Sequence, residues 1–321
     1  MHKILILIMI PLLYSCIREI NPVIIDIEET YLAGEGVFIL NEGNFRSGNG
    51  SLSFFSYDSL KIFNHVFQDI NNRPLGDVPY SMGIDAGMAY ILFNNSDKIE
   101  VAERNDLKSV TTMKKIVSPR YISFTGGTKA YVTSLYSDSV TILDLLSNSV
   151  SGFINLKKSS EAIVALSTKA YVANWAGGNK IMVINTVTDQ VTDSIEVGIE
   201  PESMVIDKSE MLWVLCNGGW KRENFAELIA INTGTNKIEK RFTFPSVTDS
   251  PTCLQINDTG ETLYYLHNGV RRMDTGASNL PSGVFISEQN HVFYKLGVNP
   301  SNNQIFVTDA LDYVQKGRVI R

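Results

Sequence analysis

The chain has 321 residues and a formal net charge of −6, with 44% hydrophobic and 19% charged residues. This hydrophobic share is large enough to form a folded core and excludes a largely disordered chain. The acidic balance, without any basic stripe, excludes a nucleic-acid partner because nothing would neutralise the phosphates.

The N-terminus has the features of a secretory signal. A basic start at His2 and Lys3 precedes an apolar run that is too short to span a bilayer and ends at Tyr14-Ser15-Cys16. This ending resembles a bacterial lipobox, in which the cysteine is lipidated and becomes the first residue. The predicted divisions are a lipoprotein signal peptide (1–15), a tether (16–35) and a β-propeller (36–321).

Lipidation of Cys16 would make the protein an outer-membrane lipoprotein that meets the membrane through its lipid anchor. We expect it at the cell surface, and the periplasmic side stays open as the alternative. Simple cleavage of the signal and a retained anchor are the other readings of this segment.

Seven copies of one apolar phrase follow, most clearly KAYVTSL at Lys129 and KAYVANW at Lys169. The aromatic residues of the phrase are Phe38, Tyr90, Tyr131, Tyr171, Trp213, Tyr264 and Phe306, at spacings of 52, 41, 40, 42, 51 and 42. The runs are short, rich in Val, Ile and Tyr, and bounded by Gly, Asn, Asp and Pro. A period in the low forties is typical of a propeller blade of four strands. The sequence therefore predicts an all-β, seven-bladed β-propeller.

The two ends of the repeat are irregular. The first unit begins at the phrase strand, which is the second strand of a blade, and the last unit ends in GRVIR, early in its third strand. Propellers usually complete one blade from both termini. We therefore expect the C-terminal blade to be incomplete and its closing strands to lie beyond Arg321.

Strand alternation predicts which loops share a face. In an antiparallel blade the loop after the second strand and the loop that leads into the next blade emerge at one end. The candidate ligand-binding residues at this end are Asn44, Phe45, Tyr80, Asn95, Arg120, Tyr136, Asn174, Trp175, Glu202 and Trp220. Asp189, in a turn between third and fourth strands, is expected at the opposite end, where its loss should leave ligand binding unchanged.

The aromatic members of this set suggest a platform for a flat, partly polar ligand. Each has a competing interpretation. Asn and Gly often do no more than end strands, and each aromatic ring could simply pack between neighbouring loops.

Candidate catalytic groups are scarce. Beyond His2, only His65, His267 and His291 occur, with no pair at metal-ligand spacing and no nucleophile or phosphate-binding motif. We expect no metal, no cofactor and no enzymatic activity. Carboxylates such as Glu161 and Glu202 could form an acid/base pair at the same end. The remaining cysteines, Cys216 and Cys253, lie in apolar runs and are expected to be free and buried.

The segment ILNEGNFRSGNGSLSFFSYDS, after a lipobox and a short tether, resembles the secreted YncE-like seven-bladed propellers of gut bacteria. Within that group the chain is similar to the BtuG-type surface lipoproteins, and units such as KIMVINTVTDQVTDSIEVGIEPESMVID match the YncE-like pattern. The resemblance implies a non-enzymatic protein that captures cobalamin or another corrinoid and delivers it to a TonB-dependent outer-membrane transporter.

Two other classes stay open. An interaction propeller, like those of surface layers, would use the same face for a protein or a glycan. A propeller lyase or lactonase would need a metal or a histidine-centred site near the axis.

Overall fold

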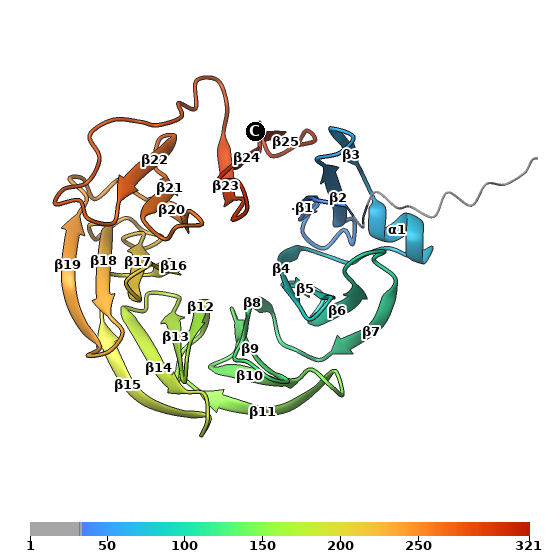
Figure 1. Cartoon of the computed structure of the whole chain (residues 1–321), viewed down its shortest axis with the longest axis horizontal. Helices are drawn as coiled ribbons and strands as arrows, with labels where there is room; N and C mark the ends of the chain where they lie inside the picture. Colours follow the sequence, from blue (N-terminus) through green and yellow to red (C-terminus); the bar gives the residue numbers. More distant parts are fainter. Residues whose placement is uncertain (1–31, 33) are drawn as a thin grey trace, which may run out of the picture.

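Seven small antiparallel sheets form a ring in the computed structural model, which describes residue 32 and residues 34–321 (Figure 1). The prediction of an all-β, seven-bladed propeller is confirmed. Within the described residues, no helix has the length and apolar character that a membrane crossing requires. The ring order follows the sequence, so neighbouring blades are consecutive units of the repeat (Figure 1).

Blades 2 to 5 each contain four strands in sequence order. Their bounds are β4 (Pro79–Asp85), β5 (Met88–Phe93), β6 (Lys98–Glu103) and β7 (Ser109–Lys114); β8 (Pro119–Phe124), β9 (Lys129–Ser134), β10 (Ser139–Asp144) and β11 (Ser149–Asn155); β12 (Ser160–Leu166), β13 (Lys169–Asn174), β14 (Lys180–Asn185) and β15 (Gln190–Glu196); and β16 (Pro201–Ile206), β17 (Met211–Cys216), β18 (Glu227–Asn232) and β19 (Lys237–Thr243).

Blades 1, 6 and 7 contain three strands each. Their bounds are β1 (Gly36–Asn41), β2 (Ser51–Ser56) and β3 (Lys61–Phe63); β20 (Thr252–Ile256), β21 (Thr262–Leu266) and β22 (Val270–Asp274); and β23 (Phe293–Val298), β24 (Ile305–Asp309) and β25 (Arg318–Ile320). One short helix, α1 (Val66–Asn71), joins blade 1 to blade 2.

The phrase strands are β1, β5, β9, β13, β17, β21 and β24. In blades 2 to 7 each is the second strand, and β1 opens its sheet with no inner neighbour among the described residues. Blade 7 ends at its third strand, β25, as the sequence indicated. Further strands beyond Arg321 stay a prediction.

The core lies between neighbouring blades. In β9 and β13 every residue after the first lysine is buried, because both faces of a second strand pack on a neighbouring sheet. The cluster between blades 4 and 5 joins Tyr171 and Val183 to Leu212 and Val214. A strand that is buried on both faces has a continuous run of apolar residues. An outer strand is buried on one face, so its apolar and polar residues alternate.

The lysine and tyrosine of the KAYV phrase join blade 3 to blade 4 and blade 4 to blade 5, at the end opposite the phrase loops. Tyr131 donates its hydroxyl to Asp189, and the Lys129 ammonium lies 2.6 Å from the same carboxylate. Lys129 also donates to the Thr186 carbonyl at 2.5 Å. Tyr131 is fully buried, so its hydroxyl needs an acceptor, and the turn of blade 4 supplies it.

The next blade repeats this contact. Lys169 donates to the Thr233 carbonyl at 2.6 Å, and the Tyr171 hydroxyl donates to the same oxygen at 3.1 Å. Asn236 takes the place that Asp189 has in the preceding blade, with its side-chain oxygen 3.3 Å from the Lys169 ammonium. The repeated phrase is therefore a repeated contact between blades.

Both cysteines are free and buried, as predicted. Cys216 ends β17, and Cys253 is the second residue of β20. Burial, followed by the nearby Glu202 carboxylate, raises the pKa of the Cys253 thiol to about 11. Burial also raises the pKa of Cys216, with Glu227 as the next cause. Neither thiol is a ready nucleophile near neutral pH.

Asp189 lies at the end where the sequence places it, but it is not an inert position. We expect Asp189→Ala to lower the free energy of unfolding by about 1–3 kcal/mol, because the buried Tyr131 hydroxyl loses its acceptor. Urea denaturation measures the change. Asp58→Ala, at an exposed turn position of blade 1, removes the same charge and should change stability little. Equal effects of the two substitutions would show that the contact between blades 3 and 4 contributes nothing.

Candidate functional site at the mouth of the propeller

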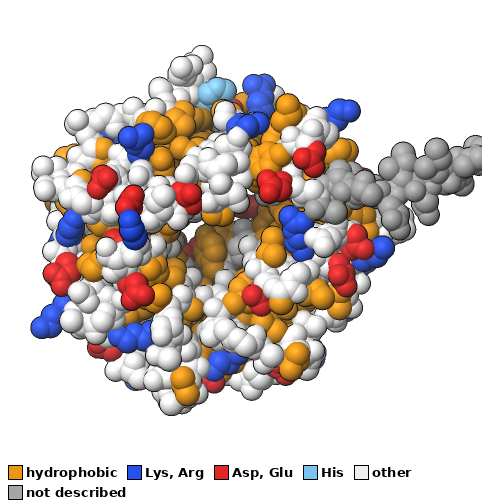
Figure 2. Space-filling view, in the orientation of Figure 1, with side chains coloured by type: hydrophobic (Ala, Val, Ile, Leu, Met, Phe, Trp, Pro, Cys, Tyr) orange, Lys and Arg blue, Asp and Glu red, His pale blue; other side chains and the backbone are white. Residues whose placement is uncertain are grey.

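One end of the ring collects the loops that the sequence singled out, and we call this end the mouth. The register pairs the first residue of each inner strand with the last residue of the phrase strand, as in Pro119 with Ser134 and Ser160 with Asn174. The loop into a blade and the loop after its second strand therefore lie side by side. The space-filling view shows that the molecule is hollowed at the centre of the ring (Figure 2).

A register shift interrupts the mouth end of six inner strands. It falls near the second residue of β4, β8, β12, β16, β20 and β23. The residues at this position are Tyr80, Arg120, Glu161, Glu202, Cys253 and Tyr294. A β-bulge turns a side chain away from the regular pleat. Every blade with an inner strand thus contributes a hydrogen-bonding or titratable group here.

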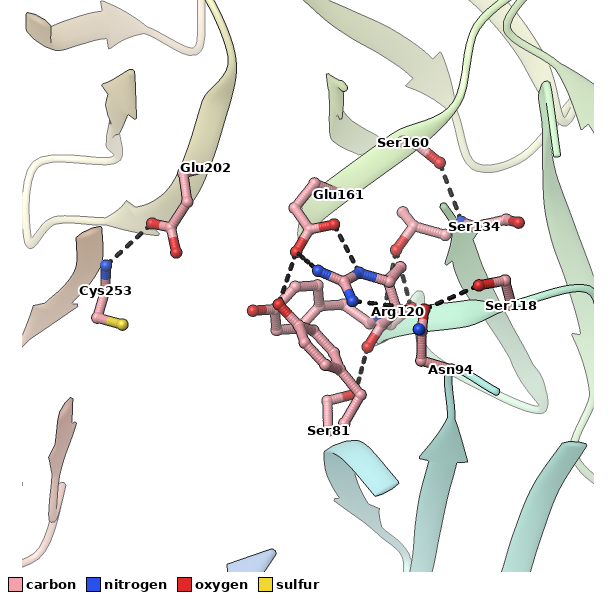
Figure 3. A network of polar contacts seen from close by, with 12 residues as sticks. Ser81, Asn94, Ser118, Arg120, Ser134, Ser160, Glu161, Glu202 and Cys253 are labelled. Atoms are coloured by element: carbon pink, nitrogen blue, oxygen red, sulfur yellow. Dashed lines mark hydrogen bonds and ion pairs between the residues drawn. The ribbon is translucent and has the colours of Figure 1, made fainter. Parts of the chain in front are cut away.

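Arg120, Glu161 and Tyr80 form a compact cluster across three consecutive blades, and Figure 3 shows the Arg120–Glu161 contact at its centre. Arg120 makes a bidentate contact with Glu161, with Nε to Oε2 at 2.7 Å and Nη2 to Oε1 at 2.6 Å. The Tyr80 hydroxyl donates to Oε1 of Glu161 at 2.9 Å. The Arg120 guanidinium also lies 3.4 Å from the centroid of the Tyr80 ring. The side chains of Arg120 and Glu161 are only 12% and 2% exposed.

This burial sets the protonation of the cluster. Burial, followed by the Glu161 charge, raises the pKa of Tyr80 well above its ordinary value, so the phenol stays protonated and donates. Burial opposes the charge of Arg120, but the attraction of Glu161 outweighs it and raises the pKa of Arg120. Arg120 therefore keeps its positive charge next to the Glu161 carboxylate.

Loops behind the cluster hold it in place. Ser81 donates to the Arg120 carbonyl at 2.5 Å, and Arg120 reaches the side-chain oxygen of Asn94 at 3.4 Å. Ser118 donates to the same Asn94 oxygen at 2.8 Å (Figure 3). Because these partners lie on several blades, they hold the Arg120 side chain in one position. This part of the mouth is therefore preorganised.

The other side of the ring contains Glu202, Cys253, Tyr294 and Lys295. Glu202 accepts from the Cys253 backbone N–H at 2.9 Å (Figure 3). Tyr294 donates to Glu42, which follows β1, at 3.1 Å. The Lys295 ammonium lies 5.1 Å from the centroid of the Tyr80 ring, so Tyr80 contacts Lys295 as well as Arg120.

Exposed aromatic rings surround these groups on loops of the mouth. Trp220 is 91% exposed, Tyr136 is 74% exposed and Phe45 is 60% exposed. Trp175 is partly buried. All four follow the second strand of the blade or, in blade 1, the phrase strand β1. Single exposed rings are ordinary on a protein surface, but several gathered at one end of a propeller are typical of a binding surface.

The Glu200 carboxylate joins two of these loops. It accepts from the backbone N–H of Gly177 at 2.9 Å and from that of Trp220 at 3.0 Å. Because Glu200 is only 8% exposed, these bonds are shielded from water. The loop that carries Trp175 and the loop that carries Trp220 are therefore tied together, which fixes the backbone from which the Trp220 ring extends.

The three predicted asparagines lie at the mouth in different settings. Asn44 is exposed, and its backbone N–H donates to Asn49 at 2.8 Å. Asn95 donates to the Asp77 carboxylate at 2.5 Å. Asn174 is buried, and its side-chain oxygen has no hydrogen-bond partner in the described part of the chain.

The structure thus divides the ten candidate residues into two groups. Tyr80 and Arg120 meet in the cluster, and Glu202 lies in the same ring. Phe45, Tyr136, Trp175 and Trp220 lie on the loops above with the asparagines. Sequence reasoning missed Tyr294 and Lys295, because residues 275–292 separate β22 from β23 and hide the repeat. The signal that could have found them is the FYKLGV run preceding the last phrase strand.

Other polar pairs offer little chemistry. Glu161 is committed to Arg120, so it is a poor partner for Glu202 in acid/base work. His267 bonds Asp249 at 2.9 Å, and His291 bonds Asp309 at 2.7 Å. In residues 32 and 34–321, no group of three or more His, Cys, Asp or Glu side chains could hold a metal ion.

The fold and the mouth define a seven-bladed β-propeller whose axis is lined by a buried polar cluster beneath exposed aromatic loops. Residues 35–317 match the model of a family described as a domain of unknown function, DUF5074, and the chain belongs to that family. No curated protein sequence matches the chain.

Solved structures with the same fold are distant in sequence. A quinonprotein alcohol dehydrogenase-like protein from Bacteroides thetaiotaomicron is 13% identical with a TM-score of 0.67, over 90% of this chain and 73% of that one. Hydrazine synthase from Kuenenia stuttgartiensis is 16% identical with a TM-score of 0.63, over 75% and 76%. The Cps50 (Swd1) propeller domain from Myceliophteria thermophila is 11% identical with a TM-score of 0.65, over 85% and 96%. These likenesses show the fold alone.

The buried ion pair gives a testable asymmetry. Arg120→Met should destabilise the protein by about 3–5 kcal/mol, because it leaves the Glu161 carboxylate buried without a compensating charge. Arg120→Met combined with Glu161→Gln should recover most of that loss, since the double variant buries no charge. Denaturant unfolding of both variants measures the difference. A double variant as unstable as the single one would contradict the inferred coupling.

Proposed function

We propose that the protein is a non-enzymatic capture protein that binds a corrinoid over the mouth of the propeller. The observation that carries the proposal is the set of exposed aromatic rings at the mouth, with Trp220 at 91% and Tyr136 at 74% exposure. Such rings provide large contact areas at a small cost in conformational entropy.

The chemistry of a corrinoid suits this face. A corrin is a wide disc with amide side chains around its rim, so it needs apolar contact together with donors and acceptors. Tyr and Trp rings can cover the apolar parts, and Asn side chains can pair with the amides.

Preorganisation supports a role in capture. Glu200 joins the Trp175 and Trp220 loops through hydrogen bonds. The Arg120–Glu161 pair links blades 3 and 4 near the propeller axis. A rigid site loses little entropy when the ligand binds, so affinity can come from a moderate contact area.

The cellular setting of the proposal follows from the predicted N-terminus. A lipid at Cys16 would keep the propeller at the outer membrane, facing the cell surface, where a bound corrinoid could pass to a TonB-dependent transporter. Cys16 lies outside the described residues, so this part of the proposal rests on the sequence and on the resemblance to BtuG-type propellers.

The direct test is a calorimetric titration of the purified propeller with cyanocobalamin. Trp220→Ala and Tyr136→Ala should each weaken binding by about 2 kcal/mol, the scale of an aromatic anchor at an interface. Both side chains are exposed, so neither truncation should disturb the fold.

Phe153→Ala is the matched control. Phe153 is 66% exposed on β11, the outer strand of blade 3, and its loss should leave the affinity unchanged. No binding of cyanocobalamin by the wild-type protein would overturn the corrinoid proposal. Binding of a protein or a glycan with the same sensitivity to Trp220 and Tyr136 would assign the face to an interaction module.

A second test concerns the anchor. Cys16→Ala should abolish incorporation of a labelled fatty acid and move the protein from the membrane fraction to the soluble fraction, because one acylated terminus is its predicted membrane contact. Fractionation and metabolic labelling measure the two effects. Membrane association that persists in Cys16→Ala would contradict lipidation as the anchor.

A further inference from the structure

Arg120 and Lys295 are the two cations at the mouth ends of the inner strands. Within the described residues, Arg120 has a bonded counter-charge and Lys295 has none. The Lys295 backbone N–H donates to Thr308 at 2.9 Å, so the start of β23 is fixed next to β24. Its ammonium contacts only ring faces, 5.1 Å from the Tyr80 centroid and 5.7 Å from the Tyr294 centroid.

The contrast with Arg120 is clear. The Arg120 guanidinium donates to side-chain oxygens of Glu161 and Asn94, at N···O distances of 2.6–3.4 Å. Lys129 and Lys169, at the opposite end, each bind a backbone carbonyl and a side-chain oxygen. Lys295 has three ammonium donors and no oxygen acceptor at hydrogen-bond distance in the part of the chain that the structure describes.

The environment keeps this ammonium charged. Burial acts against the charge, but the acidic groups around it, Tyr121, Cys253 and Glu202 in that order, raise the pKa of Lys295 above its ordinary value. Near neutral pH the phenol and the thiol are protonated. Glu202 is the one carboxylate among these groups, and it forms no ion pair with Lys295 in the described structure. One of its oxygens is already bonded to the Cys253 N–H.

Lys295 is also reachable. Its residue is only partly buried, at the mouth end of an inner strand that lines the axis. A cation held between two aromatic faces keeps its attraction for anions, because ring contacts satisfy none of its N–H donors.

We propose that the Lys295 ammonium anchors an anionic oxygen group, a phosphate or a carboxylate, of the ligand that binds at the mouth. The inference rests on the proposed function for the site of binding, but it concerns the charge of the ligand rather than its ring system. In this proposal the aromatic loops provide contact area for the ligand. Lys295 selects a ligand that carries a negative group close to the propeller axis.

The first experiment needs no corrinoid. Inorganic phosphate and acetate are titrated into the purified protein by calorimetry, with ionic strength held constant by sodium chloride. The wild-type protein should bind at least one of the two anions saturably, and the stronger one identifies the anion type. Lys295→Met should weaken that binding roughly tenfold to hundredfold, the loss expected for a charge-assisted hydrogen bond.

Lys237→Met is the matched control. Lys237 is exposed at the start of β19, at the end of the propeller opposite the mouth. Its substitution by Met changes the net charge by the same amount as Lys295→Met. Lys295→Arg should retain most of the anion affinity. Thermal melts check that each variant is folded, and Lys295→Gln replaces Lys295→Met if the latter unfolds. No saturable anion binding by the wild type, or equal binding by wild type and Lys295→Met, overturns the inference.

The second experiment separates this inference from the proposed function. Cyanocobalamin carries a phosphodiester, and dicyanocobinamide lacks it. If Lys295 anchors a phosphate-type group, Lys295→Met should weaken the binding of cyanocobalamin at least tenfold. The same substitution should change the affinity for dicyanocobinamide little. Equal weakening of both would mean that Lys295 only shapes the site, and would overturn the anchor. Anion binding through Lys295 without any corrinoid binding would uphold the anchor and reject the corrinoid.

Discussion

Each blade packs the aromatic residue of its phrase strand against the next blade, and the ring depends on this contact. Burial of Tyr131 and Tyr171 is favourable for their rings but leaves each hydroxyl in need of an acceptor. The turn between the third and fourth strands of the following blade supplies it, through Asp189 in one case and the Thr233 carbonyl in the other. Blades 3 and 4 thus depend on the next blade for this acceptor, whereas Trp213 of blade 5 donates to Asp207 of its own blade.

A ring held in this way can tolerate an irregular axis. The bulges at the mouth ends of the inner strands disrupt the ladder locally, and they place groups such as Arg120 and Glu161 where water is largely excluded. A buried ion pair contributes little net stability, because desolvation offsets the attraction. The contacts between blades supply the stability, and the polar cluster fixes the geometry of the mouth.

The mouth thus has two layers with different physical roles. The inner layer, in which Tyr80 packs on Arg120 and Glu161, is charged, and the Arg120–Glu161 pair within it is largely shielded from water. The outer layer, represented by Trp220, is exposed and apolar. Propellers with this fold include a hydrazine synthase and a Cps50 domain, so the fold does not define the function. The function of this member of the DUF5074 family is therefore argued from the chemistry of the two layers.

The sequence by itself determined the number of blades, the face that each loop occupies and the burial of both cysteines, because these follow from the repeat, from alternation and from local apolarity. It pointed to Tyr80, Arg120 and Glu202 through their place after the inter-blade turns. It did not reveal that Arg120 pairs with Glu161, that Asp189 accepts from Tyr131, or that Lys295 reaches Tyr80. Those contacts join residues 41, 58 and 215 positions apart. Only closure of the ring brings them together, since separations of that length carry no local periodic signal.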